Sequence, residues 1–180
     1  QQHQVGVTFR AAGTSLSGQA VSDSVLIILS DDWRHHVVLD NGQRIKLQPG
    51  IIGADANRVL APFGRKIGPD PASINSCKIG GIAANNASGM CCGVAHNSYY
   101  TVQDMTIVLA DGSMVDTANE TSVQNFRVKH QVMLDELQKL AFASQQNSSL
   151  RELITYKYRL KNTCGYVLNA LIDYQDPLDI

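Results

Sequence analysis

The stretch that decides the fold is Arg10-Ala11-Ala12-Gly13-Thr14-Ser15-Leu16-Ser17-Gly18-Gln19. It lies between a short β-rich run at residues 5–10 and an apolar run at residues 25–29, and both runs have the length and composition of strands. Glycine accepts backbone dihedrals that other residues avoid and lets a ligand approach the main chain closely. The pattern therefore predicts a strand, a glycine loop and a second strand.

The glycine loop has the chemistry of a phosphate cradle, because consecutive backbone N–H groups can donate several hydrogen bonds to one anion. Neither Lys-Ser nor Lys-Thr follows Gly18, so it is not a Walker-type loop, and it lacks the G-x-G-x-x-G spacing of a Rossmann dinucleotide site. Nucleoside triphosphate hydrolysis and ordinary NAD binding are both disfavoured. On pattern alone, the loop is either a phosphate cradle or a plain turn.

Length and composition predict a single domain of one or two lobes with a hydrophobic core, and no partner that binds through charge. The chain has 180 residues, of which 44% are hydrophobic and 17% charged, and its formal net charge is -1. A chain of this size can bury one hydrophobic core. The low charge offers no electrostatic footprint for nucleic acid or for an acidic membrane surface.

The cysteines and the apolar runs bear on the compartment of the protein. The four cysteines are Cys77, Cys91, Cys92 and Cys164, and they show no paired metal-ligand spacing. We interpret them as free thiols of a reducing compartment, with no metal site. The longest strongly apolar run, at residues 25–29, is too short to span a bilayer, and the N-terminus has no signal-peptide character. Because the chain lacks an initiating Met, we expect its start to be internal to a longer polypeptide.

The rest of the chain predicts further strands and helices of an α+β fold. Residues 36–39 and 44–48 flank Asn41-Gly42, and residues 106–110 and 113–116 flank Asp111-Gly112, so each set predicts a hairpin. Residues 53–63 predict a short helix that stops at Gly64. Residues 68–89 read as one long irregular stretch, and such loops are usually functional.

Two helices are predicted in the C-terminal third. The first covers residues 128–143. The second covers about residues 149–161 and opens at Ser148 or Ser149, with Glu152 placed for a capping box on Ser149, and it ends at a break at residues 162–165. The apolar positions expected on the inner face of the first helix are Val128, Met133, Leu134, Leu137, Leu140 and Ala141.

Several spaced motifs carry a family resemblance. After the glycine loop come Gly68-Pro69-Asp70-Pro71-Ala72-Ser73, Ile79-Gly80-Gly81, Asn85-Asn86-Ala87-Ser88-Gly89 and Val108-Leu109-Ala110-Asp111-Gly112. In this order they resemble the FAD-binding domain of the vanillyl-alcohol-oxidase or PCMH-type superfamily. Within it they are most similar to the branch of FAD-linked D-lactate dehydrogenase and the glycolate oxidase flavin subunit.

The resemblance implies a PCMH-type domain of two α+β lobes that hold FAD between them. The small N-terminal lobe would cover about residues 1–31 and the larger one about residues 32–180, with the domain incomplete at both ends and the substrate-cap domain absent. Thr14 and Ser15 stand where covalent members offer His or Cys, so FAD is expected to bind non-covalently. The cofactor-binding residues that the resemblance assigns are Gly13, Thr14, Ser15, Leu16, Ser17, Gly18, Gln19, Pro69, Asp70, Pro71, Ala72, Ser73, Gly80, Gly81, Asn85, Gly89 and Ile107.

The resemblance also implies a function for the parent enzyme. It would oxidise a D-2-hydroxy acid, with D-lactate as the expected substrate and glycolate or D-2-hydroxyglutarate as alternatives. Electrons would pass from FAD to a quinone, a cytochrome or an iron–sulphur module. The enzyme would be cytoplasmic or peripheral to the inner membrane, and this chain would carry no catalytic residue and have negligible turnover by itself. A non-catalytic nucleotide-binding module is the alternative of a different class.

Individual side chains leave further alternatives open. Arg10 either neutralises phosphate or pairs with a carboxylate on a surface strand. Asp70 either organises a turn between two prolines or contacts the flavin. His96, without a visible partner, is interpreted as structural, and Cys91 and Cys92 as buried thiols. The glycosylation sequons at Asn86, Asn119 and Asn147 are interpreted as chance matches.

Overall fold

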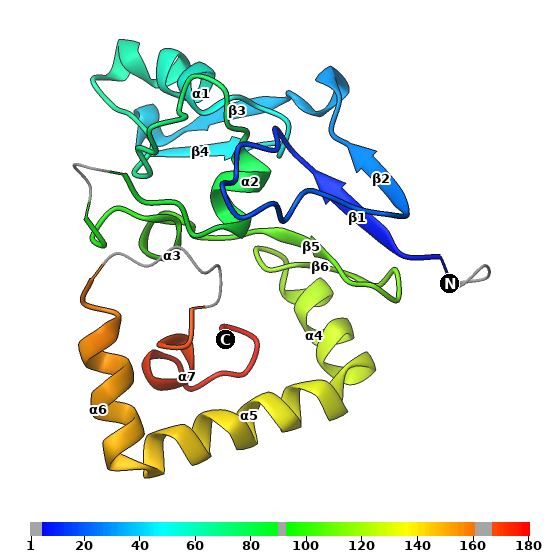
Figure 1. Cartoon of the computed structure of the whole chain (residues 1–180), viewed down its shortest axis with the longest axis vertical. Helices are drawn as coiled ribbons and strands as arrows, with labels where there is room; N and C mark the ends of the chain where they lie inside the picture. The colour runs from blue at the N-terminus through cyan, green and yellow to red at the C-terminus, as the bar shows by residue number, and fades with distance from the viewer. Residues whose placement is uncertain (1–4, 90–92, 161–166) are drawn as a thin grey trace. The chain divides into compact units, whose positions relative to one another are not determined.

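The chain forms two compact units in the computed structural model, which describes residues 5–89, 93–160 and 167–180 (Figure 1). The first unit contains the described residues up to Thr101, and the second begins at Val102. Cys91, Cys92, Cys164 and the break expected at residues 162–165 lie outside the described residues. The mixture of helices and strands confirms the α+β class, whereas the expected lobe boundary near residue 31 stays a prediction.

Strands β1 (Val7–Arg10) and β2 (Val25–Ile28) of the first unit pair in parallel, from Val7 opposite Val25 to Arg10 opposite Ile28. The predicted order of strand, glycine loop and strand is therefore confirmed. Parallel strands end at the same edge of a sheet, so the loop leaves β1 beside the end of β2. No third strand from the described residues joins this pair, and its apolar side chains are open to solvent, with Phe9 69% and Ile28 59% exposed.

Strands β3 (His36–Leu39) and β4 (Arg44–Leu47) form the first predicted hairpin, with Leu39 opposite Arg44. The connection contains the short 3₁₀ helix η2 (Asp40–Gly42), preceded along the chain by η1 (Asp31–Trp33). The positive φ angles expected for Asn-Gly are present, and they extend back to Asp40, whose φ is 48°. An ion pair between Asp40 and Arg44 links the turn to β4.

Helix α1 (Gly53–Leu60) continues into η3 (Ala61–Phe63) and ends at Gly64, which has a φ of 65°. The predicted helix and its glycine stop are therefore confirmed. The reading of residues 68–89 as one irregular stretch is wrong in part, because α2 (Ile79–Ala84) lies inside it. Its side chains join a small core of Cys77, Ile82 and Ala87. A further short helix, α3 (Ser98–Thr101), completes the described elements of this unit.

The second unit opens with the other predicted hairpin. Strand β5 (Thr106–Val108) pairs with β6 (Met114–Asp116) in antiparallel fashion, with Ile107 opposite Val115, and Gly112 has the positive φ, 81°, that the tight turn needs. Both hairpins are thus confirmed. A core cluster of Val115, Phe126 and Leu134 packs the hairpin against the helices that follow.

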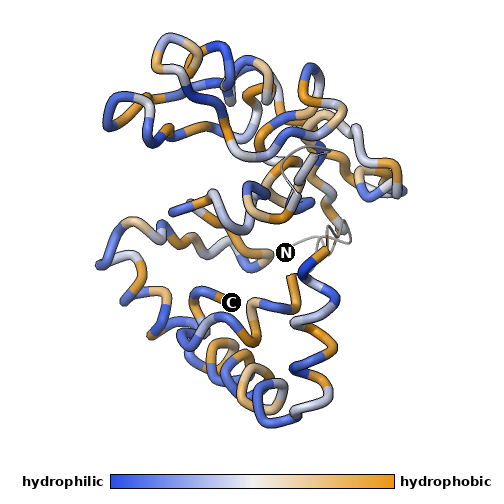
Figure 2. Tube along the Cα trace, turned by 90° about the vertical axis from the view of Figure 1, so that its left-hand side faces the viewer, coloured by the Kyte–Doolittle hydropathy of each residue, from blue (hydrophilic) through white to orange (hydrophobic). Residues whose placement is uncertain are grey.

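In residues 117–160 and 167–180, four helices follow the hairpin: α4 (Glu120–Lys129), α5 (Gln131–Gln146), α6 (Ser148–Lys157) and α7 (Ala170–Asp173). The first three run one after another around α7 (Figure 1), and hydrophobic residues recur along their turns between hydrophilic ones (Figure 2). No helix in the described part of the chain combines the length and the apolarity that a bilayer-spanning segment requires.

The helix boundaries correct the sequence prediction. Val128 belongs to α4, which was not predicted, and is 82% exposed. Of the inner face expected for the next helix, Leu134 and Ala141 are buried and Leu137 is half-buried, whereas Met133 and Leu140 are exposed.

Asparagine side chains decide where two of these helices begin. Asn119 accepts a hydrogen bond from Ser122 N at 2.9 Å, and Asn147 accepts one from Leu150 N at 3.0 Å. The expected capping box of Ser149 and Glu152 is therefore wrong, because Asn147 caps α6. Both asparagines belong to sequons, and these contacts give them a structural reason to be present.

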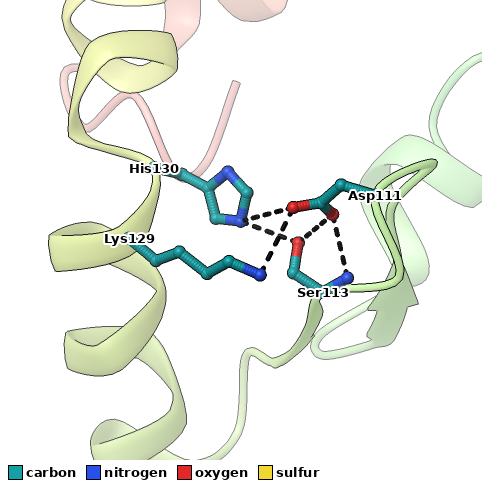
Figure 3. A network of polar contacts seen from close by, with 4 residues as sticks. All are labelled: Asp111, Ser113, Lys129 and His130. Carbon is teal, nitrogen blue, oxygen red and sulfur yellow. Dashed lines mark hydrogen bonds and ion pairs between the residues drawn. The ribbon is translucent and has the colours of Figure 1, made fainter.

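A polar network ties the β5–β6 turn to the end of α4 (Figure 3). The Asp111 carboxylate accepts hydrogen bonds from Ser113 N at 2.8 Å and from Ser113 Oγ, and Lys129 Nζ lies 3.3 Å from it. His130 Nε2 lies 2.7 Å from Ser113 Oγ. The hydrogen bonds from the Ser113 side chain and backbone, aided by Lys129, lower the pKa of Asp111 to about 2.

This network predicts an acid-sensitive contribution to stability. The folded-state pKa of Asp111 is depressed, so its stabilising effect is present above the ordinary pKa of an aspartate and is lost as the pH falls toward about 2. Asp111→Asn should lower the melting temperature at neutral pH. It should also remove the share of the acid-induced loss of stability that comes from protonation of Asp111, as measured by circular dichroism from pH 7 to pH 2. Ser113→Ala removes the strongest contact and should move the loss to higher pH. An acid profile of Asp111→Asn that matches wild type would contradict the assignment.

Candidate cofactor-binding site

The first predicted site segment is the glycine loop that leaves the end of β1. Residues 13–19 are all exposed, and Gly13 and Gly18 both have a φ of 71°. The contacts described within the loop are local: Ser15 Oγ donates to the Gln19 side chain, and Val21 N donates to Gly18 O at 3.0 Å. The loop is therefore an open structure in which two left-handed residues bend the backbone, the geometry in which main-chain N–H groups can surround an anion.

Arg10 lies across this loop. A β-carbon added at Gly13 would be 2.7 Å from both Cζ and Nη2 of Arg10, so the guanidinium rests against the glycine and leaves no room for a side chain there. Arg10 is half-buried, and its side chain makes no ion pair or hydrogen bond with another residue that the structure describes. Arg10 was expected either to neutralise phosphate or to pair with a surface carboxylate. The described residues show no such carboxylate beside it.

The second and third site segments are joined backbone to backbone. Asp70 N donates to Ser88 O at 2.6 Å, and Asp70 forms a parallel bridge with Gly89. Gly89 has a φ of 151°, and a β-carbon added there would lie 2.5 Å from the carbonyl carbon of Asp70. The Asp70 carboxylate faces Lys66 Nζ at 3.4 Å. Asp70 thus helps to organise the chain, as one interpretation of the Pro-Asp-Pro motif expected.

The residues after Asp70 form a compact turn. Pro71 O accepts a hydrogen bond from Ile74 N at 2.9 Å, and Ser73 O accepts one from Cys77 N at 2.8 Å. Pro69 is buried, whereas Ala72 is exposed. Cys77 itself is buried, and this burial raises the pKa of its thiol, as expected for an inert cysteine.

Helix α2 brings the third segment beside the start of the glycine loop. Gly80 N donates to Pro49 O at 2.9 Å, and a β-carbon at Gly80 would lie 2.9 Å from Pro49 Cβ. The corresponding position at Gly81 is 3.6 Å from Ala11 Cβ. Lys78 Nζ donates to Leu29 O at 2.6 Å, so α2 also lies beside the end of β2. Gly80 therefore has a packing reason to be glycine.

The structure brings most predicted segments into one connected body but leaves two parts outside it. Asp70 meets Gly89, and Gly81 lies beside Ala11, two residues before the glycine loop, whereas residues 14–19 make only local contacts among the described residues. Asn85 ends α2 and is half-buried. Ile107 belongs to the second unit, where it is 37% exposed on β5, and its role stays a prediction.

A buried polar cluster at the end of the third segment was missed by the sequence analysis. Asn86, with a φ of 43°, accepts a hydrogen bond from Tyr99 N at 2.9 Å through its side chain. Ser98 Oγ donates to Ile82 O at 3.0 Å. Ser88 Oγ is buried without a hydrogen-bond partner among the described residues. The run of polar residues that ends at Gly89 could have indicated this cluster. It contains asparagines, and asparagine tolerates the left-handed backbone conformation better than other non-glycine residues.

Two features of the second unit resemble functional sites, but their contacts are those of structural elements. Asp111, Ser113 and His130 have the residue types of a hydrolytic triad, yet Asp111 is hydrogen-bonded to the serine instead of orienting the imidazole from its far nitrogen. A shallow groove of about 650 Å³ is lined by residues that include Arg127, Leu134 and Asp176. It contains none of the predicted cofactor residues, and its Arg127–Asp176 ion pair joins α4 to the C-terminal segment.

Comparisons with known proteins identify a family and several relatives. The sequence profile of a family described as "FAD binding domain" matches residues 1–118. Glycolate oxidase subunit GlcD of Escherichia coli (strain K12) is 37% identical over 94 residues, covering 49% of this chain and 18% of that protein.

Two other relatives extend the comparison. D-2-hydroxyglutarate dehydrogenase of Haemophilus influenzae is 25% identical over 124 residues, covering 68% of this chain and 12% of that protein. D-lactate dehydrogenase [cytochrome] 1, mitochondrial, of Saccharomyces cerevisiae is 32% identical over 112 residues, covering 59% of this chain and 19% of that protein. The matches thus span less than a fifth of each of these relatives. No solved structure matches the chain significantly.

Proposed function

We propose, from the premise that this chain belongs to the family of FAD binding domains, that its first unit holds the diphosphate of FAD in the glycine loop at residues 13–19. The observation that carries the proposal is the exposed loop at the end of a parallel strand, bent by two left-handed glycines. The Arg10 guanidinium lies against Gly13 and has no partner among the residues that the structure describes. The family membership confirms the resemblance drawn from the sequence.

The residues present fit the chemistry of this cofactor. A diphosphate needs several hydrogen-bond donors, and the loop supplies main-chain amides beside the cation of Arg10. The rest of FAD needs a rigid wall, and we propose that it is built by residues 69–73, Gly80, Gly81, Asn85 and Gly89, with Ile107 as a further contact. The cofactor is FAD, and its binding is non-covalent, in keeping with Thr14 and Ser15 in the loop.

We further propose that the parent protein oxidises a D-2-hydroxy acid, with D-lactate as its substrate. When bound, FAD would supply the acceptor for the hydride that leaves the α-carbon of the hydroxy acid, and with release of the hydroxyl proton the 2-oxo acid would form. The contribution of this chain is to bind and orient the cofactor. The names of the relatives support the substrate class, because glycolate, D-2-hydroxyglutarate and D-lactate are all 2-hydroxy acids.

The proposal includes an electron acceptor and a compartment. Reduced FAD would be reoxidised by a quinone, a cytochrome or an iron–sulphur module, and the protein would work in the cytoplasm or at the surface of the inner membrane. The low net charge of -1 and the small charged fraction support the absence of a nucleic-acid partner.

The test has a binding arm and a turnover arm. Titration of the purified chain with FAD should quench flavin fluorescence, and acid should release unmodified FAD from the complex. The intact polypeptide that contains this chain should then reduce an artificial electron acceptor with D-lactate and not with L-lactate, with glycolate and D-2-hydroxyglutarate as parallel substrates. Binding without turnover on any of them would favour a non-catalytic nucleotide-binding module. Turnover on the L enantiomer alone would remove the D-hydroxy-acid proposal.

A further inference from the structure

We infer that Arg10 is a diphosphate-binding residue of the site, whose guanidinium supplies the positive charge that the glycine loop lacks. This inference rests on the proposed binding of FAD and deepens it, because it adds a charged side chain to a loop that would otherwise bind through neutral groups. The ligand chemistry that it recognises is the diphosphate of the dinucleotide.

The position of the guanidinium carries the first step. Arg10 is the last residue of β1, directly before the loop, and its side chain folds back onto Gly13. The close approach of Cζ and Nη2 to Gly13 places the cation at the beginning of the bend that the left-handed conformation of Gly13 creates. Main-chain N–H groups and the guanidinium are thus presented at the same bend.

The local charge carries the second step. Between Gln1 and Ser22, Arg10 is the only residue with a full charge at neutral pH. Its side chain has no carboxylate partner among the described residues, although it is half-buried. A guanidinium without a counter-ion among these residues is available to pair with an anion in the loop. Guanidinium also offers a planar fork of donors that matches phosphate oxygens in pairs.

A matched arginine of the same unit shows the alternative arrangement. Arg58 Nη2 lies 2.6 Å from Asp55 Oδ1 on α1, so its charge is already neutralised within the protein. Arg58 lies on α1, which carries none of the residues assigned to the cofactor. It is therefore a control for the loss of one arginine charge that does not touch the predicted site.

The experiment compares Arg10→Gln with Arg58→Gln in the full chain. Arg10→Gln should raise the Kd for FAD about tenfold or more, because a hydrogen-bonded charge pair is lost, whereas Arg58→Gln should leave it near the wild-type value. Arg10→Lys keeps the positive charge but lacks the paired N–H donors of the guanidinium, so it should give an intermediate Kd for FAD. The wild-type affinity should also weaken with added salt more steeply than that of Arg10→Gln.

Two further ligands locate the interaction. ADP carries the diphosphate without the flavin, and riboflavin carries the flavin without phosphate, so Arg10→Gln should weaken ADP binding and leave riboflavin binding unchanged. An unchanged Kd for FAD in Arg10→Gln, or an equal loss for riboflavin, would overturn the inference while FAD binding by the wild type still stood. If wild type did not bind FAD, the proposed function would fail as well. Should Arg10→Gln not fold, a salt-independent FAD affinity of wild type would overturn the inference.

Discussion

Gly89→Ala is expected to destabilise the first unit by about 4 kcal/mol, which is a large share of the folding free energy of a typical domain. Gly89 has a φ of 151°, a conformation that side chains rarely adopt, and its Cα faces the backbone of Asp70. A β-carbon there would lie 2.5 Å from the carbonyl carbon of Asp70, and main-chain atoms cannot move aside as a flexible side chain would. The bridge between residues 70 and 89 would have to open, and with it the junction of two predicted cofactor segments.

The matched control for this prediction is Gly64→Ala. Gly64 also has a positive φ, 65°, but no described atom lies within 4 Å of the position that its β-carbon would take. Its substitution carries the backbone strain alone, which costs about 1 kcal/mol. Urea denaturation followed by circular dichroism measures both variants. Equal losses would show that the contact with Asp70 is not what constrains position 89.

Gly13→Ala is expected to weaken FAD binding about a hundredfold while most of the folding stability is retained. The added methyl group would occupy the place where the Arg10 guanidinium lies, 2.7 Å from its Cζ, so the side chain would have to swing away. The positive φ of Gly13 would be strained as well, and the bend of the loop would change. Both changes act on the donors that the diphosphate needs. Flavin fluorescence titration measures the loss.

Gly18→Ala separates the two causes. Gly18 has the same φ of 71°, but the nearest atom to its added β-carbon is Val21 Cγ2 at 3.9 Å, so no cation is displaced. We expect a loss of affinity that is clearly smaller than that of Gly13→Ala. If the two variants lost affinity equally, backbone strain would explain both, and the position of the guanidinium would be irrelevant to binding. Melting curves of both variants show whether the fold is kept.

The parts of the fold that depend on local chemistry were predictable from the sequence. Asn41-Gly42 and Asp111-Gly112 indicated both hairpins because their turns need positive φ angles, which the structure shows. Gly64 marked the end of a helix for the same reason. The cap of α6 at Asn147 was missed, because the serine–glutamate pattern of Ser149 and Glu152 competed with an asparagine cap two residues earlier. Helix α4, which Asn119 caps, was not predicted.

Helix α2 could not be predicted from its own composition. Two adjacent glycines at residues 80 and 81 disfavour a helix in an isolated segment, and each costs about 1 kcal/mol relative to alanine. The helix forms because its glycines let it lie against Pro49 and Ala11, which come from distant parts of the chain. Such contacts depend on the tertiary fold and leave no mark in a short window of sequence.

The candidate site, like the fold, has features that local sequence predicts and features that depend on the tertiary structure. The glycine loop and the Pro-Asp-Pro motif were recognisable as local patterns, and the resemblance to a family supplied their order. The backbone bridge of Asp70 to Gly89 and the position of Arg10 over Gly13 became visible only in three dimensions. The two interpretations of Arg10 differed in its neighbours, and a linear sequence does not specify which side chains become neighbours in space.

The exposed parallel pair of β1 and β2 affects how FAD titrations of this protein should be performed. Among the described residues, β1 and β2 pair with no third strand, and Phe9 and Ile28 are open to water. Open strand edges beside exposed apolar side chains promote self-association. Samples should therefore be kept dilute and checked by light scattering before each measurement. Otherwise, precipitation of the apoprotein would imitate a loss of ligand affinity.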